Sequence, residues 1–233
     1  MFEARIDLRN AKLCLTSNGH IAPRSAPNID VQPPLWTLND STLVVVDAQY
    51  IVYVETADAK DTLILLDRVS KAKTRLETAY SQYSQLRMYT DQSTTLVTIA
   101  SSPYAPPAVI AIRLDQILPV LDAHTVQVPT RILQKIEAAE AVPEAYVSVP
   151  ESITFPTRQI GRAAHALLYP PTNPEFQAPA GTLPPCRMVA HGGPTSCSSA
   201  SFNLTVLYWT SRGWAVCAVN YGGSSGYGYE YRC

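Results

Sequence analysis

The stretch "CRMVAHGGPTSCSSASFNLTVLYWTSRGWAVCAVN", residues 186–220, decides the fold. It opens with a short strand-like segment that breaks into the glycines of HGGP. Phe202, Val206 and Trp209 then recur at spacings of four and three, which is helical, and Gly213 follows where a left-handed residue would end the helix. The sequence WAVCAVN is a nearly continuous apolar run, as in a strand covered on both faces. Strand, glycine turn, helix and strand form a βαβ unit, so we expect an α/β layer here.

The middle of the chain has a different pattern, with short β-type runs between polar turns. From about residue 40 to residue 130, these runs hold four to eight residues rich in Val, Ile, Leu, Thr and Tyr. The same order of strands occurs about twice, near 41–80 and near 84–130. This predicts two four-stranded blades of a β-propeller, although a β-sandwich fits the same spacing. Residues 130–146 predict one short helix or a linker, and the proline-rich residues 1–40 predict loops or edge strands.

Composition narrows the class of protein. Eighteen basic and nineteen acidic residues leave a net charge of −1, and charged residues are 16% of the 233 residues, against about 25% in ordinary soluble domains. We therefore expect neither a nucleic-acid nor a membrane partner. The apolar runs are interrupted or shorter than the ~20 residues of a membrane helix, and the N-terminus has no apolar signal core, so we expect a soluble cytoplasmic protein.

The cysteines and glycine motifs predict no bound cofactor or metal. Five cysteines without a C-x-x-C pair indicate buried thiols in a reducing compartment rather than a zinc site or a disulfide framework. The P-loop signature is absent, and GYGYEY lacks the third glycine of a dinucleotide-binding turn.

The HGGP turn has a specific chemical use at the carboxyl end of a strand. Glycines adopt positive φ without steric cost, and their amides approach a ligand atom closely. Two such donors aimed at one point stabilise the oxyanion of acyl transfer, and each lost donor costs roughly 2.7 to 4 kcal/mol. The alternative is a tight turn that only ends the strand.

Five segments, in their order and at their separations, carry a resemblance to a known family. They are "SVPESITFPT", "ALLYPPTNPEF", "HGGPTS", "YWTSRGWAV" and "VNYGGSSGYGYEYR". Over about residues 147–232 the chain resembles the start of the catalytic domain in the prolyl oligopeptidase family of serine peptidases, most closely its acylaminoacyl-peptidase and dipeptidyl-peptidase branch. The resemblance implies a mixed fold, with a partial β-propeller over residues 1–146 and the N-terminal part of an α/β-hydrolase domain over residues 147–233.

The resemblance also assigns roles to the turn. It implies that Gly193 chiefly, and Gly192 second, form the oxyanion hole, and that His191 holds the turn and is not the catalytic base. It places five residues in motifs that shape the floor of the site between the two domains: Arg212, Tyr221, Gly222, Gly223 and Gly226. The chain departs from the family pattern at Cys186-Arg187, where apolar strand residues are expected, since a charge in a buried strand is costly unless it is paired.

The catalytic triad is expected outside this chain. Residues 222–226 match G-x-S-x-G, which would make Ser224 a nucleophile, but nine residues follow it, with no Asp and no His among them. A nucleophile elbow needs a following helix, and in this fold Asp and His come after the serine. The other histidines and the paired carboxylates are interpreted as surface or packed residues: His20, His124, His165, Glu137 and Glu140.

Two functions follow as hypotheses. The first is a fragment of a serine peptidase that hydrolyses short peptides by acyl transfer, with the chain alone inactive because the nucleophilic Ser, the Asp and the His lie beyond Cys233. The second is a non-catalytic protein-interaction stub derived from such a peptidase. The expected partner of the full-length enzyme is a short peptide substrate, and a homo-oligomer is left open.

Overall fold

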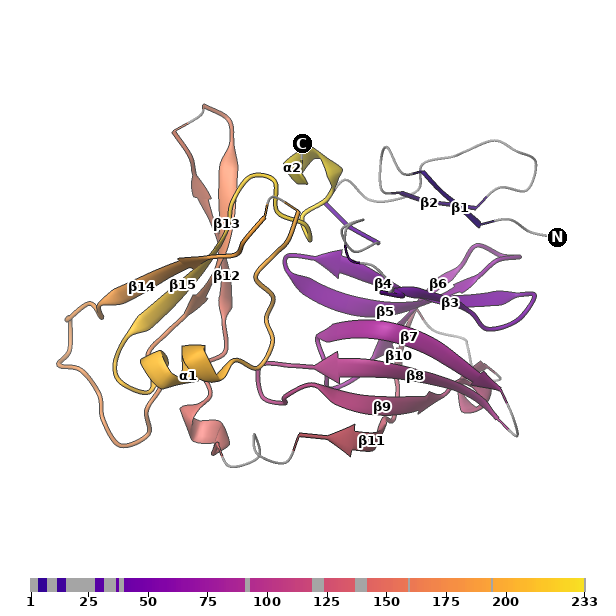
Figure 1. The fold of residues 1–233 in the computed structure, drawn as a ribbon, viewed down its shortest axis with the longest axis horizontal. Helices are drawn as coiled ribbons and strands as arrows, with labels where there is room; N and C mark the ends of the chain where they lie inside the picture. The colour runs from indigo at the N-terminus through magenta and orange to yellow at the C-terminus, as the bar shows by residue number, and fades with distance from the viewer. Residues whose placement is uncertain are drawn as a thin grey trace.

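The computed structural model is built mainly from β-strands, in three larger sheets and one two-stranded sheet (Figure 1). It describes residues 4–7, 12–15, 28–31, 37, 40–90, 93–118, 124–136, 142–158, 160–193 and 195–232. Near the N-terminus, β1 (Ala4–Asp7) and β2 (Lys12–Leu15) pair antiparallel.

The first large sheet has five strands in the order β10-β6-β5-β4-β3. Its strands are β3 (Leu43–Val45), β4 (Tyr50–Ala57), β5 (Lys60–Asp67), β6 (Lys73–Glu77) and β10 (Thr125–Gln127). Strands β3 to β6 form an antiparallel meander, whereas β10 joins β6 in parallel. The four strands expected near residues 41–80 are therefore present.

The second sheet has four antiparallel strands in the order β11-β9-β8-β7. They are β7 (Gln82–Thr90), β8 (Thr94–Ser101), β9 (Ala108–Arg113) and β11 (Arg131–Lys135), and a 3₁₀ turn, η1 (Leu114–Gln116), follows β9. The fourth strand lies just after the expected range of 84–130, because β10 pairs with the first sheet instead.

A short helix was one prediction for residues 130–146. It is wrong for Arg131–Lys135, which form the strand β11. Ile132, Ile136 and Ala139 recur at helical spacings of four and three, but of these three only Ile132 lies in β11. The open edge of β9 accepts β11 as an antiparallel partner, and every residue of β11 is exposed. Residues 137–141 lie outside the described residues.

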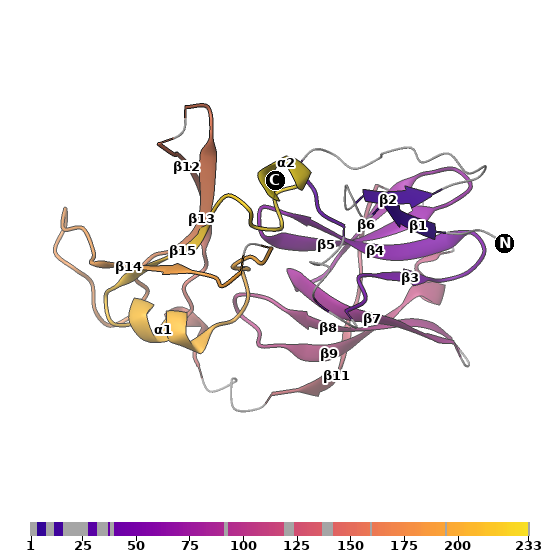
Figure 2. The same ribbon diagram turned by 45° about the horizontal axis from the view of Figure 1, so that its top comes forward.

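These two sheets lie side by side (Figure 2), and one hydrophobic core contains buried residues of both. The first sheet contributes alternate residues of its central strands, and the second contributes the inward residues of β8 and β9. Fully buried members include Val52, Leu63, Leu96, Ile110 and Ile112. Since each such side chain stabilises the fold by roughly 1.5 to 3 kcal/mol on burial, this core holds the two sheets together.

The third sheet has four strands in the order β12-β13-β15-β14. After the 3₁₀ turn η4 (Glu144–Tyr146) come β12 (Glu151–Pro156), β13 (Ala163–Tyr169), β14 (Cys186–Ala190), α1 (Leu204–Thr210), β15 (Ala215–Asn220) and α2 (Tyr229–Arg232). Strands β14 and β15 are parallel and are joined through α1, so the predicted βαβ unit is confirmed. Gly213 has φ +84, the left-handed conformation expected after the helix.

Arg187 does not lie in a buried strand. Within the described residues β14 is the outer strand of its sheet, and Arg187 is exposed. Its guanidinium lies 4.7 Å from the ring centroid of Trp209 on α1, in a cation–π contact. An edge position therefore accommodates the charge that a central strand would exclude.

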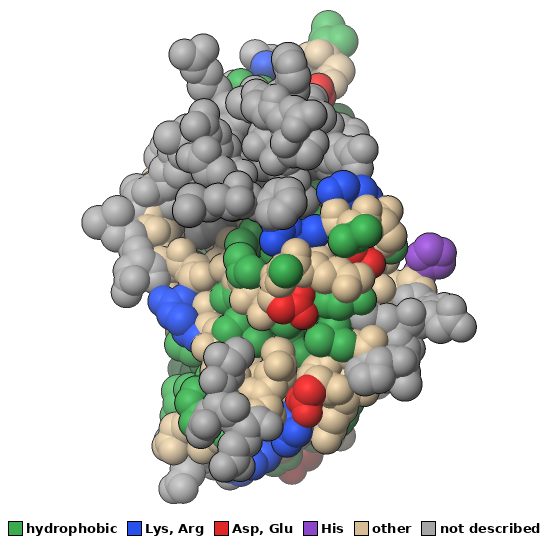
Figure 3. Space-filling model, turned by 90° about the vertical axis from the view of Figure 1, so that its right-hand side faces the viewer, with side chains coloured by type: hydrophobic (Ala, Val, Ile, Leu, Met, Phe, Trp, Pro, Cys, Tyr) green, Lys and Arg blue, Asp and Glu red, His purple; other side chains and the backbone are tan. Residues whose placement is uncertain are grey.

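The face drawn in Figure 3 has no patch of described side chains that carry the same charge. There, acidic and basic side chains are interspersed with hydrophobic ones among the described residues. This mixture agrees with the net charge of −1. No helix in the described part of the chain combines the length and the apolar character that crossing a membrane requires.

Candidate active site

The glycine turn lies directly after β14, at the carboxyl end of that strand. Gly193 has φ +70, a conformation that favours glycine because it has no Cβ atom. Gly192 and Gly193 are both exposed, and a Cβ atom added at either would meet nothing within 4 Å. Their amides have no hydrogen-bond acceptor among the residues that the structure describes. The turn is thus open to a ligand on one side.

Tyr221 holds the other side of the turn. Its hydroxyl donates to the carbonyl oxygen of Gly193 at 2.6 Å and to that of His191 at 3.1 Å. Its ring stacks on the His191 imidazole, with centroids 4.5 Å apart and an interplanar angle of 19°. Tyr221 follows β15 directly, and because β14 and β15 are parallel, the residues after both strands meet at one edge of the sheet. The parallel pairing therefore brings Tyr221 to the turn.

Ser224 contacts the same turn through the His191 side chain. Its Oγ lies 2.7 Å from Nε2 of His191, a hydrogen bond, and Ser224 is fully buried. The only partner that the described residues offer Nδ1 of His191 is the carbonyl oxygen of Gly192, at 3.4 Å, so no described carboxylate orients the ring as in a triad. The Ser224–His191 pair instead fixes the imidazole beneath the turn.

Asn220 joins the segment after the turn to the glycine-rich loop. It is fully buried, its Oδ1 accepts from the amide of Ser198 at 2.7 Å, and its Nδ2 donates to the carbonyl oxygen of Ser198 at 3.0 Å. The same Nδ2 donates to the hydroxyl of Tyr227 at 2.9 Å, and the amide of Ser225 donates to the carbonyl oxygen of Ser196 at 3.0 Å. Residues 195–200 and 221–228 consequently form one hydrogen-bonded unit.

The remaining candidate residues lie apart from the turn. His165 on β13 stacks on Tyr227 at 4.3 Å, and burial lowers the pKa of its imidazole, as expected for a packed histidine. His124 is exposed. Arg212 lies just before β15, at the opposite end of the parallel strands from the turn, where it stacks on Tyr208 at 3.9 Å. His20, Glu137 and Glu140 lie outside the described residues.

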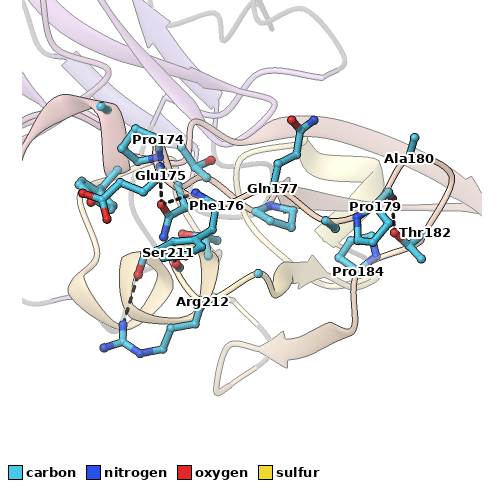
Figure 4. Close-up of a pocket in the computed structure, with 18 of the residues that line it drawn as sticks. Pro174, Glu175, Phe176, Gln177, Pro179, Ala180, Thr182, Pro184, Ser211 and Arg212 are labelled. Atoms are coloured by element: carbon cyan, nitrogen blue, oxygen red, sulfur yellow. Dashed lines mark hydrogen bonds between the residues drawn. The ribbon is translucent and has the colours of Figure 1, made fainter.

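A surface hollow lies next to Arg212, between the end of α1 and the proline-rich loop of residues 171–184 (Figure 4). Asn173 secures this loop: its Nδ2 donates to the carbonyl oxygen of Ser211 at 2.8 Å, and its Oδ1 accepts from the amide of Glu175 at 2.8 Å. The residues that line the hollow do not include His191, Gly192 or Gly193. The hollow is thus separate from the glycine turn.

Sequence reasoning missed Asp30. This buried residue accepts hydrogen bonds from the glycine-rich loop, although it comes from a proline-rich segment that the sequence left unplaced. A single aspartate between Ile29 and Val31 in a proline-rich segment carries no signal of its own burial. Among the described residues, no group of three His, Cys, Asp or Glu side chains could hold a metal ion.

Solved structures similar to this chain are peptidases. No family model matches the sequence, and no curated protein matches it. A puromycin-hydrolysing peptidase of Mycobacterium tuberculosis is 28% identical with a TM-score of 0.77, and the match covers 97% of this chain and 33% of that one. Puromycin hydrolase is 30% identical with a TM-score of 0.78, over 96% of this chain and 32% of that one. The dipeptidyl peptidase 4 of Porphyromonas gingivalis, at 20% identity and a TM-score of 0.65, shares the fold over 95% of this chain and 29% of that one.

The fold and the comparisons agree that this chain is similar to part of a peptidase. These neighbours are members of the prolyl oligopeptidase family, so the resemblance that the sequence showed is confirmed. The chain spans about a third of the length of the puromycin-hydrolysing structures that it matches.

Proposed function

We propose that the chain is the part of a serine-type peptidase that carries the oxyanion hole. In this proposal the chain joins a partial β-propeller, residues 1–146, to the first part of an α/β-hydrolase domain, residues 147–233. The complete enzyme hydrolyses short peptides by acyl transfer in the cytoplasm. The nucleophilic Ser, the Asp and the His come from sequence beyond this chain, so the chain alone is inactive.

The observation that carries the proposal is that hydrogen bonds from Tyr221 fix the backbone of the glycine turn on its carbonyl side. Tyr221 binds the carbonyl oxygens of His191 and Gly193, and no described acceptor binds the amides of Gly192 and Gly193. Donors that are fixed before the reaction need no reorganisation when charge develops on the substrate oxygen, which is the basis of oxyanion stabilisation.

The turn has one task in this mechanism. When a serine attacks the scissile carbonyl, the carbonyl oxygen gains negative charge, and the amide of Gly193, with that of Gly192 second, donates to it. His191 takes no proton in this step, because its Nε2 is engaged with the buried Ser224. A mutant of puromycin hydrolase has been solved complexed with PGG, which supports a short peptide as the substrate class.

The first experiment sequences the transcript through and past the codon for Cys233. A frame that continues into a glycine-rich serine elbow, followed by an Asp and a His, gives the complete protein for assay with acyl-amino-acid and dipeptidyl anilides. The 233-residue chain should show no turnover. Turnover by this chain that Ser224→Ala abolishes would overturn the proposal.

A matched pair of variants then tests the turn in the complete protein. Gly193→Ala forces a Cβ into a left-handed conformation at φ +70 and displaces the amide, so kcat should fall by roughly 10²- to 10³-fold, the loss typical of one oxyanion donor. Gly181→Ala carries the same change at φ +80 with open space around it, in a loop apart from the turn, and should retain activity. Equal kcat values for the two variants would exclude Gly193 from the oxyanion hole.

A second candidate is a non-catalytic interaction protein. One observation favours it: Met188 on the outer strand β14 is 71% exposed, so an apolar side chain stands open on a sheet edge that another chain could cover. Size-exclusion chromatography and thermal unfolding of the 233-residue chain separate the two candidates. A monodisperse, cooperatively melting chain or homo-oligomer favours an interaction protein, whereas aggregated or partly molten material favours part of a larger enzyme.

A further inference from the structure

Asp30 occupies a position where three parts of the chain meet. It is 3% exposed, and it forms an isolated antiparallel bridge with Thr56 at the end of β4, with backbone hydrogen bonds of 2.9 and 2.7 Å. Its side chain points away from this bridge to the glycine-rich loop after β15, as the bonds of its carboxylate show. Segment 28–31, the β4–β5 hairpin and the third sheet are thereby connected through one residue.

The carboxylate of Asp30 is bound on both oxygens. Oδ2 accepts from the amide of Gly226 at 2.6 Å and from that of Gly228 at 3.3 Å, and Oδ1 lies 3.3 Å from Nη1 of Arg232. The Asp30 and Arg232 side chains are 4% and 12% exposed. Burying a carboxylate costs several kcal/mol unless charge-assisted bonds offset it, and here three donors do so.

The bonds to Asp30 fix backbone that only glycine adopts easily. Gly226 has φ +89 and Gly228 has φ +85. A Cβ on Gly226 would lie 3.4 Å from Cγ2 of Thr56 and 3.7 Å from Cα of Ala59, so the loop packs closely on the β4–β5 hairpin. Ala59 at the tip of that hairpin is buried in the same hydrophobic cluster as Leu167 and Val216 of the third sheet.

The segment that Asp30 holds leads directly to the turn. Ser224 lies two residues before Gly226, and its Oγ bonds Nε2 of His191. The amide of Gly223 donates to the carbonyl oxygen of Tyr231, next to Arg232, so the loop is closed on both sides of Ser224. Asp30 thus reaches His191 through a short series of bonded residues.

We propose that Asp30 is a positioning residue for the oxyanion turn. Its carboxylate sets the backbone of Gly226–Gly228 and the guanidinium of Arg232. This arrangement fixes Ser224, and Ser224 holds the His191 imidazole against Tyr221 under the glycines. The role in catalysis rests on the proposed function, but the positioning of His191 does not.

The experiment measures the imidazole ¹⁵N shifts of the histidines in the complete protein, labelled selectively at histidine, by NMR, with His191 assigned from the His191→Gln variant. In the wild-type protein the two nitrogens of His191 should show one fixed tautomer. Asp30→Ala removes every bond of the carboxylate, Asp30→Asn keeps one acceptor oxygen and removes the charge, and Arg232→Gln removes the charged donor alone. Asp115→Ala removes a carboxylate from a bidentate pair with Arg113 on the second sheet and serves as the matched control.

The expected result is that the His191 shifts move toward the averaged values of exposed His124 in all three test variants, most in Asp30→Ala, and stay unchanged in Asp115→Ala. Wild-type His191 shifts in both Asp30→Asn and Arg232→Gln overturn the proposal, whether or not Asp30→Ala folds. A shift of equal size in Asp115→Ala also overturns it, because the response would then reflect general loosening.

These outcomes are independent of catalysis. If the His191 shifts respond as expected while Gly193→Ala leaves kcat of the complete protein unchanged, the proposed function fails and the positioning by Asp30 stands. If kcat falls in Gly193→Ala while the His191 shifts stay unchanged in Asp30→Asn and Arg232→Gln, the proposed function stands and the positioning by Asp30 fails.

Discussion

The hydroxyl of Tyr221 donates to the carbonyl oxygen of Gly193 at 2.6 Å, across 28 residues of sequence. Gly193 follows β14 and Tyr221 follows β15, so the bond links the carboxyl ends of two parallel strands. It leaves the amide side of the turn open, which is the side that the proposed chemistry uses.

Tyr221→Phe should loosen this turn. The substitution removes the bonds to the carbonyl oxygens of Gly193 and His191 but keeps the ring that stacks on the imidazole. We expect a loss of about 1 to 2 kcal/mol in the free energy of unfolding, because each hydrogen bond contributes about 1 kcal/mol. Urea denaturation measures it. Tyr208→Phe, at an exposed tyrosine on α1, is the control and should change stability by less than about 0.5 kcal/mol; equal effects would contradict the prediction.

Gly226→Ala should destabilise the contact between the glycine-rich loop and the β4–β5 hairpin. A Cβ at φ +89 costs about 1 to 2 kcal/mol, and its 3.4 Å distance from Cγ2 of Thr56 adds to that cost. Gly161→Ala isolates the conformational part, because Gly161 has φ +80 and a Cβ added there would meet nothing within 4 Å. The melting temperature of Gly226→Ala should be lower than that of Gly161→Ala. A melting temperature of Gly226→Ala equal to or above that of Gly161→Ala would show that the contact with Thr56 adds no cost.

The stability of the chain should depend on pH through Asp61. Burial raises the pKa of this carboxyl to about 6, although hydrogen bonds from the amide of Tyr83 and the hydroxyl of Thr56 favour its charged form. The folded chain therefore binds the proton more tightly than the unfolded chain, in which an Asp has a pKa near 3.9. The stabilisation by the protonated group is complete below about pH 4 and is lost as the pH rises through about 6.

Asp61→Asn tests this pH dependence, because an amide does not titrate. The wild-type chain should lose about 2 to 3 kcal/mol of unfolding free energy from this group between pH 4 and pH 7, since one pKa unit corresponds to about 1.4 kcal/mol. The variant should lose correspondingly less over the same range, in urea titrations at several pH values. Parallel pH profiles for the two chains would show that Asp61 titrates normally.

Asn203→Ala should weaken α1 at its start. The Oδ1 of Asn203 accepts from the amides of Thr205 and Val206, which are unpaired within the helix. Losing this N-cap should cost about 1 kcal/mol, whereas Asn203→Asp keeps an acceptor and should stay near wild type. Chemical denaturation compares the two variants, and an Asp variant as unstable as the Ala variant would show that the cap is not the cause.

Local patterns predicted the elements around the glycine turn. The apolar run WAVCAVN, the helical spacing of Phe202, Val206 and Trp209, and Gly213 gave β15, α1 and its left-handed end. Residues 131–135 form a strand where the spacing of Ile132, Ile136 and Ala139 predicted a helix or a linker, because pairing with the open edge of β9 selects the strand. Arg187 looked misplaced until its strand proved to be the outer one.

The sequence by itself determined the resemblance to the family, the βαβ unit and the existence of a glycine turn, because these depend on residue types at short spacing and on ordered motifs. Only the tertiary structure placed Asp30 beneath Gly226, Tyr221 on the carbonyl oxygens of the turn, and Ser224 in a buried bond with His191. Such contacts join residues that are 28 to 196 positions apart. They form because strand pairing and burial bring the chain segments together, and no local pattern encodes which distant groups will then satisfy each other's hydrogen bonds.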